Sequence, residues 1–360
     1  MNIVLIHRAD LDKRPPVLSA AINIISLGHN LTIITTGVSD KVKCELEKLN
    51  VNIIVVKYKM HKNPFELIIR TIKYRNKIRK TLKKFSEDYY TLWIEGNYTI
   101  SSLFGIFNKY TYYLQIQELY KNKIEYLTTK YVIKNAKGVF MPEYNRSHIY
   151  RLFFNLSKLP YILPNKPYFI PNENELDSLK NKYPDIVRSL MDKKIILYQG
   201  ALTDERKLDK FLIAFNRLKE YTVVLLGKDH GVLSRYKKLN PDIIHIPFIT
   251  APDYLMITSL AYIGIVTYVP DTLNTIYCAP NKISEYTAFG IPILANDIPG
   301  LRYQVQYNDI GVVVNEENEN DIISSFLHIV NNYSKYSSAC VRYFNSIDNK
   351  STIKKALQDS

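Results

Sequence analysis

The sequence contains few cysteines and no long apolar run. Its three cysteines, Cys44, Cys278 and Cys340, are odd in number and far apart, which disfavours a disulfide framework or a zinc site and fits a reducing cytoplasm. No segment approaches the roughly 18 consecutive apolar residues that a membrane span needs. The longest candidate, 254–269, is interrupted by Gly264. The first residues show no basic region followed by an apolar core, so we expect no secretory signal.

What the sequence does contain is a regular alternation of two kinds of segment. The first half suggests strands at 2–7, 31–35, 51–56, 90–95, 111–116 and 138–141, with helices between them, one of them near 101–108. The second half repeats the alternation from residue 194 to residue 331. Alternating strands and helices are typical of parallel sheets covered by helices on both faces. The fold class we predict is therefore α/β, with two Rossmann-like domains that face each other across a cleft.

The length of 360 residues also suits two domains. A cluster of prolines (Pro160, Pro164, Pro167, Pro171) disfavours helix and suggests a connection between them. We predict a first domain over 1–165, a linker over 166–190 and a second domain over 191–340. The remaining residues, 341–360, are expected to form a C-terminal helix that could return to the first domain.

The net charge of +14 is concentrated in the first half of the chain. Residues 1–170 hold 27 Lys and Arg against 12 Asp and Glu, which leaves 21 and 22 for the rest. The densest segment is 62–85, where most cations fall on one helical face and apolar residues such as Ile68, Ile72 and Ile78 lie mostly on the other.

This basic amphipathic helix has two interpretations. It is either a solvated helix docked on a sheet or a patch that binds an anionic membrane. In the second case its membrane contacts are Arg70, Lys73, Lys77, Lys80 and Lys84. We expect no nucleic-acid partner, because no recognition motif accompanies the charge.

The most informative segment is 279–297, with the sequence APNKISEYTAFGIPILAND. It predicts a helix over 282–289 that begins after Pro280 and ends at Gly290, followed by a buried strand. Lys282 and Glu285 lie near the amino end of this helix, where free N–H groups and a partial positive charge favour a diphosphate. Glu285 is placed to accept hydrogen bonds from ribose hydroxyls. An ordinary surface helix is the alternative.

Other candidate ligand residues follow the expected strands of the second half. Because ligands bind at the carboxyl ends of such strands, the loops there should form one site. Glycine lets a backbone approach a ligand closely, and paired cations neutralise phosphate oxygens without a metal. The residues that meet these criteria, besides Lys282 and Glu285, are Gly200, Arg206, Lys207, Gly227, Ile249 in the loop 248–250, and Asn281.

The segment 280–292 resembles the donor-site signature of family 4 glycosyltransferases, which have the two-domain GT-B fold. Residues 200–207 resemble the diphosphate loop of that family, and 307–314 resemble the glycine-strand piece that follows. In the first domain the resemblance is to bacterial surface-polysaccharide members, and it rests on 117–120, on Pro142-Glu143 with Arg146, and on 163–167.

The resemblance implies a sugar transfer in which the second domain binds the nucleotide sugar and the first binds the acceptor. It implies retention of the anomeric configuration, no metal or other cofactor, ribose binding by Glu285 and diphosphate binding by Lys207. The default donor is a UDP-sugar. The expected partners are a lipid-linked oligosaccharide or glycan acceptor and an anionic membrane surface, with the protein in the cytoplasm or peripheral on the inner face of the cell membrane.

The sequence departs from the family pattern in the donor loops. Tyr277 stands where the family often has the first of two glutamates, and Ala201 stands where it has an arginine. Arg206 could compensate, or Arg8 or Arg14, which we assign to the acceptor or membrane side, could reach across the cleft. The loop 9–16 replaces a glycine pair and predicts a differently shaped acceptor mouth.

Retention depends on electrostatic stabilisation of an oxocarbenium-like state more than on acid–base chemistry. Glu118 is therefore the one candidate catalytic group, facing the acceptor or the donor. Two alternative functions remain: a GT-B-type sugar-nucleotide epimerase, and a non-catalytic basic protein that binds a membrane surface.

Overall fold

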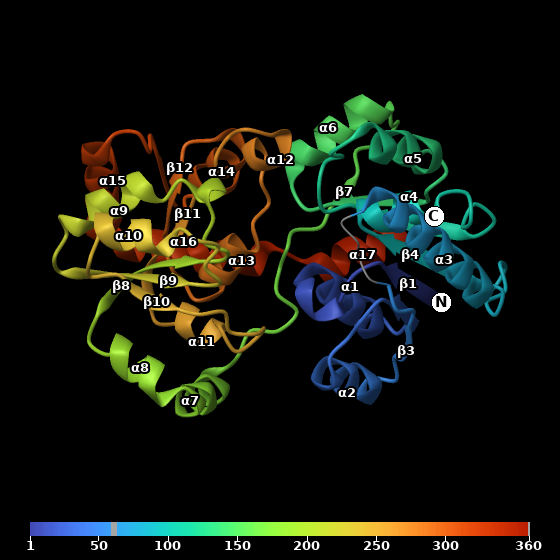
Figure 1. Ribbon diagram of the computed structural model, residues 1–360, viewed down its shortest axis with the longest axis horizontal. Coiled ribbons are helices and arrows are strands. Elements are labelled where there is room, and N and C mark those ends of the chain that lie inside the picture. The colour runs from blue at the N-terminus through green and yellow to red at the C-terminus, as the bar shows by residue number, and fades with distance from the viewer. Residues whose placement is uncertain (59–62, 359–360) are drawn as a thin grey trace. The chain divides into compact units, whose positions relative to one another are not determined.

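The structure is a computed structural model that describes residues 1–58 and 63–358. It divides into two compact units, and each holds one parallel sheet with helices on both faces (Figure 1). Unit 1 comprises residues 1–168 and 348–360, and unit 2 comprises residues 169–347. The predicted α/β class with two parallel-sheet domains is confirmed. Lys62, the first cation of the expected basic segment, lies outside the described residues.

The sheet of unit 1 has seven strands in the order β3-β2-β1-β4-β5-β6-β7. The order reverses between β1 and β4, so the carboxyl ends of these two strands form the switch point of the sheet. There His7 lies opposite Glu95 in the strand register. The strands are β1 (Asn2–His7), β2 (Asn30–Thr35), β3 (Asn52–Val55), β4 (Tyr90–Glu95), β5 (Thr111–Gln115), β6 (Gly138–Met141) and β7 (Tyr161–Ile162).

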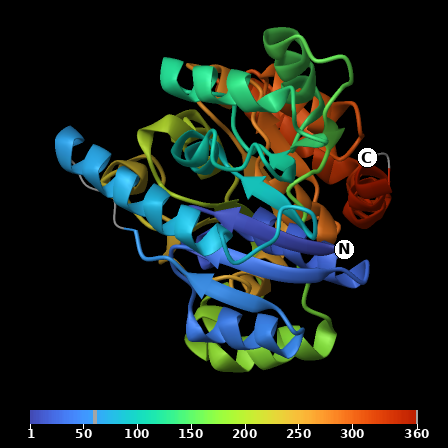
Figure 2. The ribbon, with the colours of Figure 1, turned by 90° about the vertical axis from the view of Figure 1, so that its right-hand side faces the viewer.

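Two sets of helices cover the faces of this sheet (Figure 2). One face packs against α1 (Pro15–Ser26), α2 (Asp40–Lys48) and α17 (Asn349–Gln358). The other packs against α3 (Pro64–Leu82), α4 (Asn97–Leu103), α5 (Lys123–Ile133) and α6 (Tyr144–Phe154). The single tryptophan, Trp93, is fully buried in the sheet, and its indole N–H donates to Gln115 at 2.8 Å.

The sheet of unit 2 has the order β10-β9-β8-β11-β12-β13 and reverses between β8 and β11. Its strands are β8 (Lys194–Gln199), β9 (Tyr221–Leu226), β10 (Ile244–Ile246), β11 (Ala261–Val266), β12 (Ile293–Asn296) and β13 (Gly311–Val314). Its helices are α7 (Glu173–Lys182), α8 (Pro184–Leu190), α9 (Asp209–Asn216), α10 (Leu233–Leu239), α11 (Leu255–Thr258), α12 (Leu273–Ile276), α13 (Asn281–Ala288), α14 (Pro299–Leu301), α15 (Glu319–Asn331) and α16 (Tyr333–Ser346).

The segments that join the units are more structured than the sequence suggested. The expected linker, 166–190, contains α7 and α8, and these helices belong to unit 2. They are fastened there by Asp253, whose carboxylate accepts from the Lys182 ammonium at 2.6 Å and from the Tyr183 hydroxyl at 3.0 Å. At the other end, α17 belongs to unit 1, where the Tyr113 hydroxyl donates to the Ala356 carbonyl oxygen at 3.3 Å.

Candidate functional site

Two glycines bring the loops after β8 and β9 into close contact. Gly200 has a φ of 132° and Gly227 a φ of 146°, a region that favours glycine. A Cβ atom built on Gly227 would lie 2.0 Å from the Gly200 carbonyl oxygen, and one built on Gly200 would lie 3.2 Å from Cε of Lys282. A side chain at either position would therefore push apart the backbone and the lysine that meet at this edge of the sheet.

Lys282 is buried at the amino end of α13 with no hydrogen-bond partner. Its side chain is 8% exposed, and among the described residues its Nζ atom has no donor or acceptor contact. The ammonium instead lies 3.9 Å from the centroid of the Tyr198 ring. Burial lowers the pKa of Lys282 well below its usual value, and the nearby Arg206 adds to this shift. Because a buried charge is costly unless it is paired, this site is suited to an anion.

Arg206 supplies a second cation to the same region. It ends a short 3-10 helix (Asp204–Arg206) in the loop after β8, and its guanidinium carbon lies 4.4 Å from the centroid of the Tyr268 ring. Its buried Nε has no hydrogen-bond partner among the described residues. The Lys282 ammonium lies 5.7 Å from the same ring. Tyr268 therefore has a cation from each of two elements beside it.

Lys207, the next residue, has carboxylate partners. Its Nζ lies 3.0 Å from Glu317 and 3.3 Å from Glu316, both in the segment after β13. The hydrogen bond to Glu317, with help from Glu316, raises the pKa of Lys207 against a small opposing effect of burial. Its left-handed backbone conformation (φ 46°) directs the chain from the 3-10 helix toward α9.

Glu285, one turn into α13, is held by a buried polar network. One carboxylate oxygen accepts from the Tyr254 hydroxyl at 2.5 Å, and the other accepts from the side-chain amide of Gln199. The Gln199 carbonyl in turn accepts from the Thr258 hydroxyl at 2.8 Å. Burial raises the pKa of Glu285, and the bonds from Tyr254 and Gln199 act in the opposite direction. The carboxylate is therefore fixed in place, at the carboxyl end of β8.

The remaining predicted donor residues lie at the edges of this arrangement. Asn281 is the first residue of α13, and Tyr277 is the half-buried residue that ends α12. Ile249, in the loop after β10, packs against the core of unit 2. Sequence reasoning missed Tyr198, Tyr254 and Tyr268. Their only signal was an abundance of tyrosine, 29 residues, which points to no particular position.

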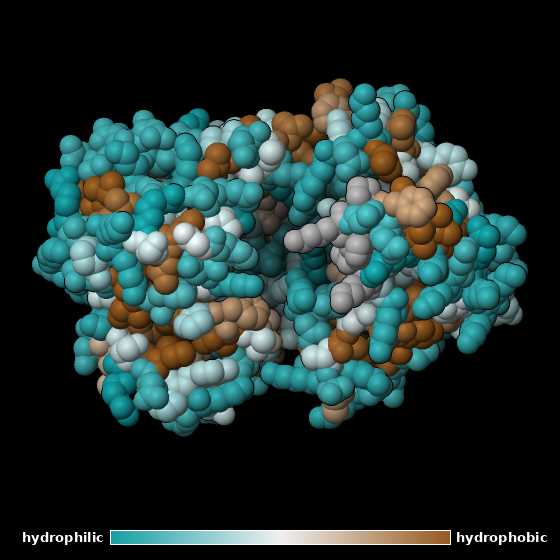
Figure 3. Space-filling view, viewed as in Figure 1, coloured by the Kyte–Doolittle hydropathy of each residue, from teal (hydrophilic) through white to brown (hydrophobic). Residues whose placement is uncertain are grey.

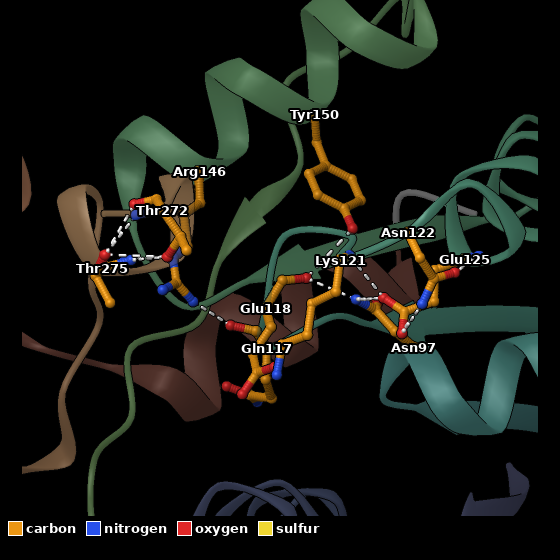
Figure 4. A network of polar contacts seen from close by, with 10 residues as sticks. All are labelled: Asn97, Gln117, Glu118, Lys121, Asn122, Glu125, Arg146, Tyr150, Thr272 and Thr275. Atoms are coloured by element: carbon orange, nitrogen blue, oxygen red, sulfur yellow. Dashed lines mark hydrogen bonds and ion pairs between the residues drawn. The ribbon is translucent and has the colours of Figure 1, made fainter. Parts of the chain in front are cut away.

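In unit 1, Glu118 lies in the loop after β5 and makes an ion pair with Lys121 at 2.7 Å (Figure 4). Its backbone oxygen accepts from Asn97 at 3.0 Å and from the Tyr150 hydroxyl at 3.3 Å. Burial opposes ionisation of Glu118, but the Lys121 ammonium, with smaller effects of Arg14 and Arg146, outweighs it and lowers the pKa. Glu118 is thus ionised at neutral pH, and its side chain is 41% exposed.

Arg146 and Glu143 support this loop from α6. Arg146 is buried, and its guanidinium donates to the Gln117 backbone oxygen (Figure 4). The Glu143 carboxylate accepts from the Arg146 backbone N–H at 3.0 Å and so caps α6. Figure 4 also draws the capping pair of α12 in unit 2, Thr272 and Thr275.

Arg8 is committed to contacts within unit 1. Its guanidinium donates to the side chains of Tyr58 and Ser102, and its carbon lies 4.0 Å from the centroid of the Tyr58 ring. These contacts join the carboxyl end of β1 to α4 and to the segment before α3. Arg14, by contrast, is exposed at the start of α1.

Four of the predicted membrane cations lie on α3, and the fifth, Lys84, lies two residues after its end. Arg70 is 3.5 Å from Glu66, whereas Lys73, Lys77, Lys80 and Lys84 are exposed and have no acidic partner in the described part of the chain. No helix among residues 1–58 and 63–358 is both long enough and apolar enough to span a bilayer.

Comparison with known proteins identifies the second unit. Residues 193–332, which carry all the donor residues described above, match the family model of glycosyl transferases group 1. The second unit is similar to a group 1 glycosyltransferase domain. The match begins one residue before β8 and ends one residue after α15, so it covers the whole sheet of this unit. A search of curated proteins finds no match.

Solved structures similar to the whole chain share the GT-B fold. A glycosyltransferase from Rickettsia africae is 16% identical, with a TM-score of 0.70 over 99% of this chain and 97% of that one. Anabaena HepE in complex with UDP is 11% identical, with a TM-score of 0.72 over 99% of both chains. A Listeria monocytogenes protein assigned as a UDP-N-acetylglucosamine 2-epimerase is 14% identical, with a TM-score of 0.65 over 99% and 94%. The fold and the family match together indicate a glycosyltransferase of the GT-B type.

Proposed function

We propose that this chain transfers a sugar from a nucleotide-sugar donor, a UDP-sugar by default, to a lipid-linked or glycan acceptor in the synthesis of a bacterial surface polysaccharide. Unit 2 holds the donor and unit 1 holds the acceptor. The observation that carries the proposal is the buried, unpartnered Lys282 ammonium beside Gly200, with Arg206 on the neighbouring loop. A diphosphate is the ligand that such a pair of cations fits best.

The donor would be held from both ends of its nucleotide. Its diphosphate would lie against Gly200, where no side chain separates the ligand from the backbone, and would pair with Lys282 and Arg206. Its ribose would lie near Glu285, whose carboxylate is fixed by Gln199 and Tyr254. Anabaena HepE, of similar fold, binds UDP and UDP-glucose. This likeness supports UDP as the first nucleotide to test.

The proposed transfer proceeds with retention and without a metal or another cofactor. The leaving diphosphate gains negative charge as the bond to the sugar breaks, and fixed cations stabilise that charge most when they have no other partner. Lys282 and Arg206 meet this condition better than Lys207, which is paired with Glu316 and Glu317. Glu118 remains the candidate for a group that faces the acceptor, since it is ionised and partly exposed.

A sugar-nucleotide epimerase is the second candidate function, because one similar structure is assigned to that activity. An epimerase would need the same nucleotide site but no acceptor and no membrane. A protein that only binds a membrane through its basic helix is the third candidate, and it would not need the buried cations of unit 2.

The test has two steps with the purified full-length chain. Thermal unfolding is first followed with UDP, GDP, CMP and dTDP and their sugars, without added metal, because a ligand of the folded state raises the midpoint. A rise with one nucleoside diphosphate is expected. The donor sugar that raises it is then incubated alone and with a lipid-linked glycan. Transfer only with the acceptor supports the proposal, and isomerised donor without acceptor would replace it with the epimerase. No rise with any nucleotide would overturn both.

A further inference from the structure

Helix α3 has an exposed apolar stripe that the basic-helix prediction did not describe. Its buried residues, Tyr74, Ile78 and Leu82, all lie in the C-terminal half. Phe65, Ile68 and Ile72, spaced three and four residues apart, are 70%, 58% and 51% exposed. At 100° per residue they form one face, between the buried residues and the lysines. We call these three residues the α3 stripe.

Helix α5 carries a second stripe of the same kind. Ile124, Leu127 and Tyr131 have the same spacing and are 69%, 60% and 58% exposed. The opposite side of α5 is buried in the core of unit 1 through Val132 and Ile133. These three exposed residues are the α5 stripe. Soluble surfaces carry isolated apolar side chains as a rule, but two aligned stripes in one region indicate an interaction surface.

The two stripes are joined through the residues at the end of α4. The Phe104 ring lies 6.1 Å from that of Tyr131 in an edge-on arrangement. On its other side the Arg75 guanidinium lies 5.3 Å from the same ring and donates to the Phe104 backbone oxygen at 2.9 Å. Figure 3 shows apolar side chains, in brown, gathered over α4 and α5 among hydrophilic ones. Because Arg75 lies one helical turn after Ile72, Phe104 and Arg75 connect the two stripes along one surface of unit 1.

The charges around this face select the kind of partner. Exposed lysines accompany both stripes: Lys73 and Lys77 on α3, and Lys123 and Lys130 on α5. The acid of α5, Glu125, is buried and binds the Lys121 backbone N–H at 2.9 Å, so it does not offset these cations at the surface. Apolar residues flanked by unpaired lysines suit the boundary between acyl chains and anionic headgroups.

We infer that the α3 and α5 stripes insert into the surface of an anionic lipid bilayer while the neighbouring lysines contact its headgroups. The inference rests on the proposed function in one respect, namely that the acceptor is linked to a lipid. It goes beyond the basic helix, because lysines alone would hold the protein above the headgroups, whereas the stripes enter the acyl region. Two helices, rather than one, then fix the orientation of unit 1 on the membrane.

The test uses the full-length chain and two kinds of vesicle, one of phosphatidylcholine alone and one that also contains about 30% phosphatidylserine. The pairs Ile68→Gln with Ile72→Gln, and Ile124→Gln with Leu127→Gln, each replace two of the three apolar residues of one stripe without touching a buried residue. Each is expected to lower binding to the anionic vesicles at least tenfold. The matched control is Met191→Gln, in unit 2, which is 60% exposed and should bind like the unaltered protein.

Insertion is measured separately from binding. In Leu127→Trp the new indole should show a blue-shifted emission with anionic vesicles and be quenched by brominated acyl chains, whereas buried Trp93 alone should show neither. Stripe variants that bind as well as the unaltered protein, or an indole that stays in water, would overturn the inference. So would self-association through these stripes without vesicle binding. The nucleotide-induced rise in the unfolding midpoint, followed on the same variants, reports on the proposed function independently.

Discussion

The lysines of α3 and of the residues just after it have the same side chain as Lys282 of α13 but lie in the opposite environment. Lys73, Lys77, Lys80 and Lys84 project from unit 1 into solvent, where water solvates each charge. Lys282 is buried in unit 2 against the face of Tyr198, and no described residue pairs with its Nζ. Exposed cations act together and at a distance, and salt screens them. A buried cation interacts only with a ligand in direct contact with it, and an anionic ligand favours its protonated form.

The contrast teaches where charge alone is a guide to function. The excess of positive charge in the first half of the sequence led to the basic helix directly. It gave no hint of the anion site in unit 2, where acids slightly outnumber bases in the sequence from residue 171 onward. In unit 2 an anion site is indicated by the buried environment of a few cations, and not by the number of cations.

The largest effect should follow from reversing the exposed charges. Changing Lys73, Lys77, Lys80 and Lys84 to Glu should release the protein from anionic vesicles, since each cation near such a surface contributes about 1 kcal/mol. Co-sedimentation at low and at physiological salt measures the change. Nucleotide binding should be unaffected, because these residues belong to the other unit. Vesicle binding that survives the reversal would remove α3 from the membrane role.

Changing Lys282 should weaken nucleotide binding but stabilise the unliganded protein. Lys282→Met is expected to weaken UDP binding by about 1.5–3 kcal/mol, the range for a hydrogen bond to a charged group. It should also raise the unfolding midpoint of the unliganded protein, because it removes one buried polar group that has no hydrogen-bond partner. The control is Lys219→Met, whose exposed ammonium lies 3.3 Å from Asp242 and which should change neither quantity. UDP binding at full strength in Lys282→Met would contradict the assignment.

Because the pKa of Lys282 is lowered, both the stability of the protein and its binding of UDP should depend on pH. Below the unfolded value of 10.5, the unfolded chain holds the proton that the folded chain has lost, so stability from this group rises with pH between the folded pKa and 10.5. An anion beside Nζ favours the ammonium, so UDP binding should take up a proton and weaken as pH rises through that window. Calorimetry in two buffers of different ionisation enthalpy measures the uptake, which Lys282→Met should abolish.

An effect in the same range is expected from Glu285, which carries the opposite charge one helical turn away. Glu285→Ala should weaken the binding of UDP and of uridine by about 1.5–3 kcal/mol if the carboxylate accepts from ribose. Glu285→Gln keeps the shape of the side chain and an acceptor for the Tyr254 hydroxyl, so it should weaken nucleotide binding less than Glu285→Ala does. Uridine and UDP affinities that stay unchanged in Glu285→Ala would separate Glu285 from the nucleotide.

The smallest effect should come from Lys207, whose partners are already present in the protein. Lys207→Met removes ion pairs to Glu316 and Glu317 at a site that is 32% exposed, so stability should fall by less than about 1 kcal/mol. Chemical denaturation measures it. A loss of UDP binding as large as that of Lys282→Met would mean that Lys207 leaves the two carboxylates for the diphosphate.

Much of the fold could be predicted because the residues of a short segment determine whether it forms a strand or a turn. The expected strands 90–95 and 138–141 agree with β4 and β6 to the residue. The helix expected near 101–108 runs from Asn97 to Leu103 instead, and it ends just before Gly105, whose φ is 76°. Helix α6 was not expected at all, although Glu143 caps it and Asn155, with a φ of 48°, ends it.

The candidate site could be predicted only where a loop carries its own signal. Gly200, Lys282 and Glu285 stand next to glycine or proline breaks that mark the ends of elements. Gln199 and Tyr254 stand beside similar breaks, Gly200 and Pro252, but nothing local pairs them with Glu285. They meet it because α11, β8 and α13 converge at one edge of the sheet. That convergence depends on strand order, which the alternation of elements leaves open.

The return of α17 to unit 1 has a consequence for synthesis of the chain on the ribosome. Unit 1 includes α17 (Asn349–Gln358), which is translated after all of unit 2. Ile353 and Ala356 of α17 complete a core that also contains Val17 and Trp93, so that core stays open on one side during translation. Unit 1 is therefore translated first in part but completed after unit 2. A stop codon before residue 348 would leave a complete unit 2 joined to a unit 1 whose core lacks α17.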